Sequence, residues 1–90
     1  MDNFALVVFR NRVTNEQVDL EIPLDIAARD LVYAFNAAFN LNIDVADTEQ
    51  CYLQAENPIV LLRGDKKLAD FGIRHGSIIF FNPRRGKENR

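Results

Sequence analysis

The chain has 90 residues, which is enough for one domain with a single hydrophobic core. Its composition is 48% hydrophobic and 27% charged, and this balance excludes a disordered or low-complexity chain. One cysteine, Cys51, and one histidine, His75, cannot supply an internal disulfide or a structural zinc site with four ligands. The core alone must therefore hold the fold together.

The net charge of −2 is unevenly distributed along the chain. Residues 83–90 contain four basic side chains and one acid, so residues 1–82 are the acidic part of the molecule. A predominantly acidic body is not typical of a nucleic-acid-binding domain. We therefore expect one domain over residues 1–82, followed by a basic, flexible C-terminal tail over residues 83–90.

Two strands are expected at the start of the chain. Residues 3–10 form a dense apolar stretch that ends at a polar turn over residues 14–17. Residues 18–22 then alternate between apolar and acidic side chains, which is the pattern of a half-buried strand. The short polar connection predicts a hairpin in which Asp19 and Glu21 face water.

One amphipathic helix is expected after Pro23. Asp25 is a candidate N-cap, and the apolar positions that follow have the spacing of a helix of about four turns. A single apolar stripe needs one partner surface, which a sheet would supply. The positions of this stripe are Ala28, Leu31, Val32, Phe35, Ala38 and Phe39.

The remaining elements are short. Turn signals divide the rest of the chain into a loop over residues 42–50, strands over residues 51–56 and 59–62, a compact segment over residues 68–73 and a last strand over residues 77–82. The predicted order is ββαββ, a short connection, and a final β. This order predicts an α+β fold in which a sheet of four to five strands packs on one main helix; the family resemblance described next implies that this sheet is mixed.

That order resembles the ubiquitin-like β-grasp superfamily over about residues 3–82. The segment before the last strand shows the resemblance most clearly. In these domains a leucine, an acid, an aromatic residue and an isoleucine pack the turn that leads into the last strand, and the matching residues here are Leu68, Asp70, Phe71 and Ile73. Residues 19–23, which lead into the helix, together with Leu68-Ala69-Asp70 and Gly72-Ile73, are similar to the YukD/EsaB family. Its members are small cytosolic ubiquitin-like components of bacterial type VII secretion systems.

The tail bears on the alternative that the chain is a ubiquitin-like modifier or a sulfur carrier. Proteins of these two classes end in Gly-Gly, because a terminus without side chains must enter the activating enzyme. The only late glycine here is Gly86, within Pro83-Arg84-Arg85-Gly86-Lys87-Glu88-Asn89-Arg90. The modifier or sulfur carrier is therefore the disfavoured alternative.

No set of residues predicts an enzyme. Cys51 has no histidine nearby in the sequence and is expected to be a buried, inert thiol, and His75 lies in a His-Gly turn without a nucleophile beside it. The acidic residues Asp44, Asp47 and Glu49 lack the glycine and the final glutamate of a calcium loop. We predict no catalytic residue, no metal site and no cofactor.

The strands indicate where function is to be expected, because alternate side chains of a strand point to opposite faces of the sheet. The β-grasp resemblance implies that Leu6, Val8, Leu20, Ile22, Leu53, Ala55, Ile79 and Phe81 face the helix. The opposite set then forms an apolar patch on the open face, which we predict to be a protein-binding surface: Val7, Phe9, Tyr52, Ile78 and Phe80. With this assignment Phe80→Asp should be tolerated and Phe81→Asp should unfold the chain, and a one-residue slip would exchange the two sets.

The resemblance implies a non-enzymatic adaptor or regulatory component of a type VII secretion system. We expect it in the cytoplasm, at the inner face of the membrane and without insertion, because the apolar run over residues 4–9 is too short to span a bilayer. By analogy the partner is an FtsK/SpoIIIE-type ATPase or a membrane-bound pseudokinase-like subunit. A homodimer contact is the alternative use of the patch, and a nucleic-acid or lipid contact through the tail is a weaker one.

Overall fold

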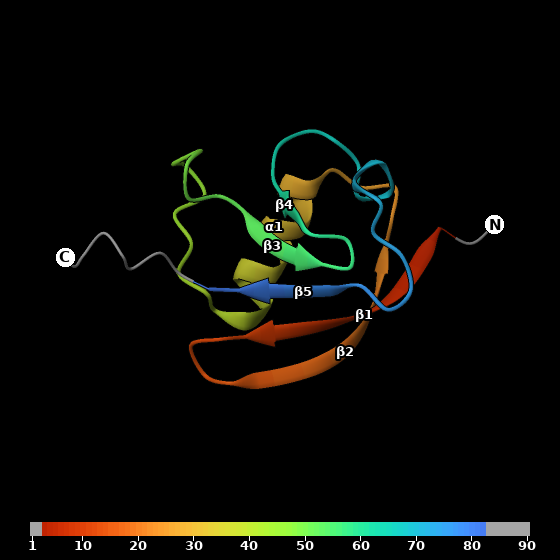
Figure 1. Ribbon diagram of the computed structural model, residues 1–90. Coiled ribbons are helices and arrows are strands. Elements are labelled where there is room, and N and C mark those ends of the chain that lie inside the picture. Colours follow the sequence, from red (N-terminus) through yellow and green to blue (C-terminus); the bar gives the residue numbers. More distant parts are fainter. Residues whose placement is uncertain (1–2, 83–90) are drawn as a thin grey trace.

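The computed structural model describes residues 3–82, so the basic tail predicted at residues 83–90 lies outside the described residues. The described elements follow the predicted order (Figure 1). They are β1 (Phe4–Asn11), β2 (Glu16–Pro23), α1 (Ala28–Phe39), β3 (Leu53–Glu56), β4 (Val60–Leu62), the 3-10 helix η1 (Leu68–Phe71) and β5 (Ile78–Phe81).

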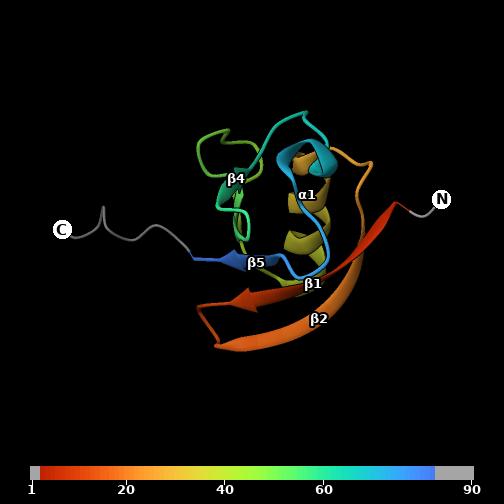
Figure 2. The same ribbon diagram turned by 45° about the vertical axis from the view of Figure 1, so that its right-hand side comes forward.

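The five strands form one mixed sheet with the order β2-β1-β5-β3-β4. The central pair, β1 and β5, is parallel. On one side of it β2 pairs antiparallel with β1, and on the other side β3 pairs antiparallel with both β5 and β4. Helix α1 crosses one face of this sheet (Figures 1 and 2). The predicted fold class, a mixed sheet of five strands packed on one main helix, is confirmed.

The core lies between α1 and the sheet. The helix buries Ala28, Leu31, Val32 and Phe35, which are four of the six predicted stripe positions. Phe39 packs against the core while half-buried, and Ala38 is exposed.

An aromatic cluster joins the helix to the first strand. The ring centroid of Phe9 on β1 lies 4.8 Å from that of Phe35 and 4.7 Å from that of Phe39. The rings of Phe35 and Phe39 are 5.3 Å apart and meet edge to face, which is a favourable aromatic geometry. This cluster fixes how α1 sits on β1.

The N-terminus of α1 differs from the prediction. Asp25 is not the N-cap; the helix begins three residues later, and its N-cap, Ala27, makes no side-chain hydrogen bond. Two of the free helical amides instead donate to backbone carbonyls of the loop before η1: Ala28 N–H to Lys66 (2.9 Å) and Arg29 N–H to Gly64 (3.0 Å). A loop distant in sequence satisfies the donors that a local side chain usually satisfies.

The connection into β5 is held by buried groups. Leu68 and Ile73 are buried, and Phe71 packs against the core, as expected from the β-grasp resemblance. Gly72 has φ +89°, a left-handed conformation that an L-residue adopts only with strain. The Oγ of buried Ser77 donates to the carbonyl of Asn57 at 2.7 Å and accepts from the Arg74 N–H at 3.0 Å. These contacts position the start of β5 in the middle of the sheet.

Candidate protein-interaction surface

The sheet face opposite α1, called here the open face, is covered by no other element of residues 3–82 (Figure 2). The strand register shows which side chains share it, because residues directly opposite on neighbouring strands point to the same side. Val8 is opposite Asp19 on β2 and Ile78 on β5. Phe80 is opposite Arg10 on β1 and Gln54 on β3.

The face assignment predicted for β1 is wrong by one residue. Val7 and Phe9 are core residues, with 2% and 1% of their surface exposed. Leu6, which was expected in the core, is 57% exposed on the open face, and Val8 is half-buried beside it. The physical reason is the ring cluster, because Phe9 fills the space beneath Phe35 and Phe39.

The assignment is confirmed on the other strands. Ile22, Leu53, Ala55 and Ile79 are buried in the core cluster. Leu20 and Phe81 pack against this cluster while partly buried, and Asp19 and Glu21 are exposed. The error is therefore confined to the first strand.

Phe80 lies on the open face but has only 8% of its surface exposed. The guanidinium of Arg12 lies 4.2 Å from its ring centroid, a cation–π geometry. The same guanidinium is 3.8 Å from a carboxylate oxygen of Glu56 on β3. The premise of the predicted contrast between Phe80→Asp and Phe81→Asp is therefore wrong, because Phe80 is buried and Phe81 partly buried, so that a charge is expected to be costly at either position.

Three neighbouring apolar side chains of the open face, exposed Leu6 and half-buried Val8 and Ile78, are called here the apolar stripe. It runs across the parallel pair β1–β5 at the centre of the sheet. Acidic side chains border it on β2, where Glu21 is opposite Leu6 and Asp19 is opposite Val8. An apolar centre with a charged rim is the usual composition of a protein-binding patch.

His75 accepts a backbone hydrogen bond beside this stripe. The backbone N–H of Leu6 donates to its Nδ1 at 3.0 Å, and the Gly76 N–H donates to the Leu6 carbonyl at 2.9 Å. The Nδ1 atom is therefore occupied as an acceptor that holds the turn before β5 against β1. Within residues 3–82, no three His, Cys, Asp or Glu side chains are grouped so that they could bind a metal ion.

Cys51 is buried, as predicted for an inert thiol. Burial raises the pKa of the thiol above its ordinary value, and the nearby positive charge of Arg63 opposes this with a smaller effect. The thiolate is the reactive form of cysteine, so this environment disfavours nucleophilic chemistry.

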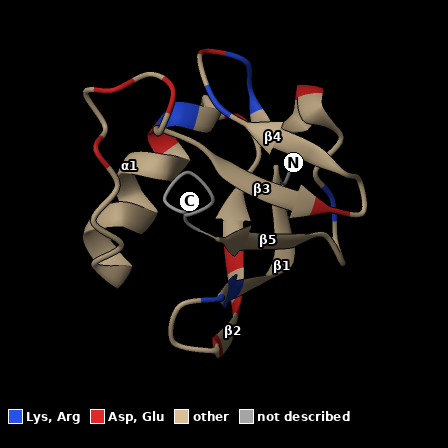
Figure 3. Cartoon of the chain, turned by 60° about the vertical axis from the view of Figure 1, so that its left-hand side comes forward, with Lys and Arg blue, Asp and Glu red and all other residues tan. Residues whose placement is uncertain are grey.

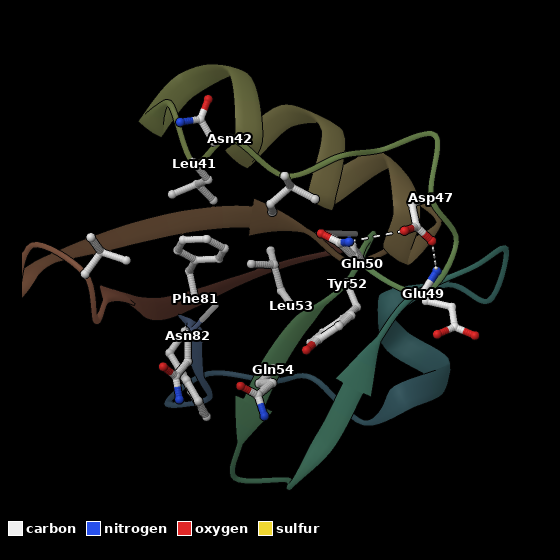
Figure 4. Close-up of a pocket in the computed structure, with 13 residues that line it drawn as sticks. Leu41, Asn42, Asp47, Glu49, Gln50, Tyr52, Leu53, Gln54, Phe81 and Asn82 are labelled. Atoms are coloured by element: carbon white, nitrogen blue, oxygen red, sulfur yellow. Dashed lines mark hydrogen bonds between the residues drawn. The ribbon is translucent and has the colours of Figure 1, made fainter. Parts of the chain in front are cut away.

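A groove of about 520 Å³ opens where β5 ends, between the loop that follows α1 and the start of β3 (Figure 4). Its lining combines apolar, aromatic and polar side chains. Tyr52 and Phe80, two of the predicted surface residues, are brought together there. The other lining residues are Val13, Leu41, Asn42, Ile43, Asp47, Glu49, Gln50, Leu53, Gln54, Phe81 and Asn82.

Charged side chains of both signs lie near the apolar stripe and the groove. Acidic side chains lie on β2 and in the loop before β3. Basic ones lie on β1 and in the β1–β2 turn, as Arg10 and Arg12, and in the loop between β4 and η1, which also contains Asp65 (Figure 3). Arg12, which covers Phe80, was not identified from the sequence, because its position depends on the path of the β1–β2 turn. No helix in the described part of the chain has the length and hydropathy that a membrane span requires.

Comparisons with known proteins agree with this geometry. The family model described as "WXG100 protein secretion system (Wss), protein YukD" matches residues 7–80. The search of curated proteins finds no match.

The chain is also similar to solved ubiquitin-like domains. The domain of tubulin-binding cofactor B superposes with a TM-score of 0.69 at 19% identity over 89% of both chains. The C-terminal domain of mouse tubulin-specific chaperone e gives 0.64 at 8% identity, over 92% of this chain and 91% of that one. Trypanosoma brucei tubulin-binding cofactor B gives 0.61 at 14% identity, over 90% and 99%. At these identities the likeness establishes the ubiquitin-like β-grasp fold alone.

Proposed function

Because the chain belongs to the YukD family of WXG100 secretion system proteins, we propose that it is a non-enzymatic adaptor or regulatory component of that system, acting by protein binding through its open face. The site of action in this proposal is the cytoplasmic side of the membrane. Mechanistically, the adaptor docks on a partner subunit without covalent chemistry.

The observation that carries the proposal is the apolar stripe. Leu6 is a large apolar side chain with most of its surface in water, although it belongs to a central strand of the sheet. Val8 and Ile78 are its half-buried neighbours, and exposed Phe4 and Leu61 extend the same face on β1 and β4. Burying this apolar surface against a partner would be favourable at about 25 cal/mol per Å² of apolar area, less the cost of association.

The acidic residues beside the stripe indicate the charge that a partner surface should carry. The acidic side chains of Asp19 and Glu21 lie along one side of the stripe, so the complementary surface should carry Lys or Arg opposite β2. The FtsK/SpoIIIE-type ATPase and the membrane-bound pseudokinase-like subunit, both expected from the family resemblance, remain the proposed partners. Self-association through the same stripe is the competing interpretation.

The test is co-purification with the secretion subunits from cells that carry the secretion locus. Leu6→Glu places a charge in the centre of the stripe, and Tyr33→Glu places one on the exposed side of α1 as a matched control. We expect the wild type and Tyr33→Glu to recover the ATPase or the pseudokinase-like subunit, and Leu6→Glu to lose it.

Circular dichroism must first show that all three chains are folded. Equal recovery by Leu6→Glu would contradict docking through the stripe. A wild-type dimer that Leu6→Glu converts to a monomer, with no subunit recovered by either chain, would favour self-association instead.

A further inference from the structure

The groove at the end of the sheet lies where the described chain stops. Asn82, the last described residue, is part of its lining, and Phe80 and Phe81 from the end of β5 form one of its walls. The facing wall comes from the loop that follows α1 and from the first residues before β3 (Figure 4). Any segment that continues from Asn82 therefore starts at the groove itself.

The lining favours a cationic occupant. Asp47 and Glu49 contribute carboxylates on the loop side, while Tyr52 and Phe81 contribute aromatic rings; the ring of Phe80, which also lines the groove, is already covered by Arg12. Guanidinium groups bind both kinds of partner, through ion pairs with carboxylates and by stacking on rings. The protein already makes such a contact at the edge of the groove, where Arg12 lies over Phe80.

We propose that this groove binds the chain's own basic segment, residues 83–90. The segment follows Asn82 directly and contains Arg84, Arg85, Lys87 and Arg90 with a single acid, Glu88. Eight residues reach roughly 26–29 Å when extended, which suffices to follow a groove that begins at their first residue. The segment has no large apolar side chain, so the aromatic walls would contact the aliphatic stems and guanidinium planes of its arginines.

Because residues 83–90 are covalently joined to the groove at Asn82, even a weak contact would keep the groove occupied. Exposed ion pairs contribute little individually, so a free peptide of this sequence would bind the groove poorly. A segment joined to the rim has an effective concentration on the order of millimolar, so a millimolar affinity gives substantial occupancy. The contact should weaken as salt is added, because Glu49 is exposed to solvent and Asp47 is only partly buried.

Occupancy would regulate the open face. Phe80 and Gln54 belong to that face as well as to the groove, so the bound segment would cover one end of the surface that a partner uses. This regulatory consequence rests on the proposed function, whereas the contact itself does not. The test below uses no partner, so its failure is distinct from a failure of partner docking.

The test is a comparison of amide signals in ¹⁵N-labelled full-length chains. The tail variant carries Arg84→Glu and Arg85→Glu, and the loop variant carries Glu49→Lys, which leaves the hydrogen bonds of Asp47 to Glu49 N–H and to the Gln50 side chain in place. A third chain combines all three substitutions. Lys67→Glu, before η1 and outside the groove lining, is the control for a change of charge alone.

We expect the tail variant and the loop variant to move the same groove amides, those of Asn42, Gln50 and Gln54, in the direction that added salt moves them in the wild type. The combined chain should return these signals part of the way toward their wild-type positions, because the reversed loop charge again faces a tail of opposite sign. Lys67→Glu should leave them unchanged.

Two results would overturn the proposal. Groove amides that do not respond to reversal of the tail charges would show that the segment does not bind there. A response that grows with protein concentration would assign the contact to the tail of a second copy instead.

Discussion

Replacement of Phe9 tests the placement of β1, on which the position of the apolar stripe depends. Phe9→Ala removes a ring that is 1% exposed and lies within 5 Å of two others, centroid to centroid. Truncation of a buried Phe typically costs about 3–5 kcal/mol. A domain of this size is stable by roughly 5–13 kcal/mol, so the variant should lose a large part of its free energy of unfolding.

Two further variants complete the experiment. Phe9→Leu keeps most of the apolar volume and should lose about 1–2 kcal/mol, which leaves a measurable transition. Leu6→Ala removes a side chain that is 57% exposed and should cost less than about 1 kcal/mol.

The assay is urea unfolding followed by far-UV circular dichroism, with unchanged m-values as the condition for comparing free energies. The order of stability should be wild type, Leu6→Ala, Phe9→Leu and Phe9→Ala. A loss at Leu6→Ala as large as that at Phe9→Ala would mean that Leu6 faces the helix, and the open-face stripe would be refuted.

Three smaller predictions follow from single contacts. Ser77→Ala should lower the free energy of unfolding by about 1–3 kcal/mol, because it leaves the Asn57 carbonyl and the Arg74 N–H without their buried partner; the same urea assay measures this, and an unchanged midpoint would contradict it. Gly72→Ala should cost about 1–2 kcal/mol in that assay, because its φ of +89° strains any residue with a Cβ; a neutral result would argue against this turn geometry. Burial raises the pKa of the Cys51 thiol in the folded chain, so the unfolded chain loses this proton first as pH rises. The protonated thiol therefore contributes its full share to the free energy of unfolding below the ordinary thiol pKa, and this share declines as pH rises above it. The free energy of unfolding should fall with alkaline pH more steeply in the wild type than in Cys51→Ala, and parallel pH profiles of the two chains would contradict the burial of this thiol.

The fold was predictable because several independent signals agree. The acid–apolar alternation of residues 18–22 indicates a half-buried strand, and the spacing of Leu31, Val32 and Phe35 indicates one apolar helical face. Turn residues separate the later strands, so their order could be predicted although they are short. These features are local, and local features can be recognised in a sequence.

The facing of β1 was not predictable from its own residues. The run Phe4–Phe9 is apolar at every position, so alternation gives no preference for either face. The hairpin register contains the missing information: Val8 is opposite Asp19, and Asp19 was correctly assigned to water. A four-residue turn over residues 12–15 would have given this register and placed Leu6 and Val8 on the open face.

The helix cap and the cover over Phe80 depend on tertiary structure. The carbonyls of Gly64 and Lys66 meet the start of α1 only after the loop before η1 has folded. Arg12 reaches Phe80 only because the β1–β2 turn returns past the end of β5. Neither contact has a local sequence signal, and the groove beside Tyr52 depends in the same way on the path of the loop that follows α1.

The central claim is that the open face binds a secretion subunit, and direct mapping of that contact tests it most closely. We would titrate a purified cytoplasmic domain of the FtsK/SpoIIIE-type ATPase into ¹⁵N-labelled chain and follow each backbone amide. We expect the signals of Leu6, Val8 and Ile78 to shift or broaden first, while that of Tyr33 on the exposed side of α1 stays in place. Changes confined to α1, with the stripe unaffected, would contradict the claim.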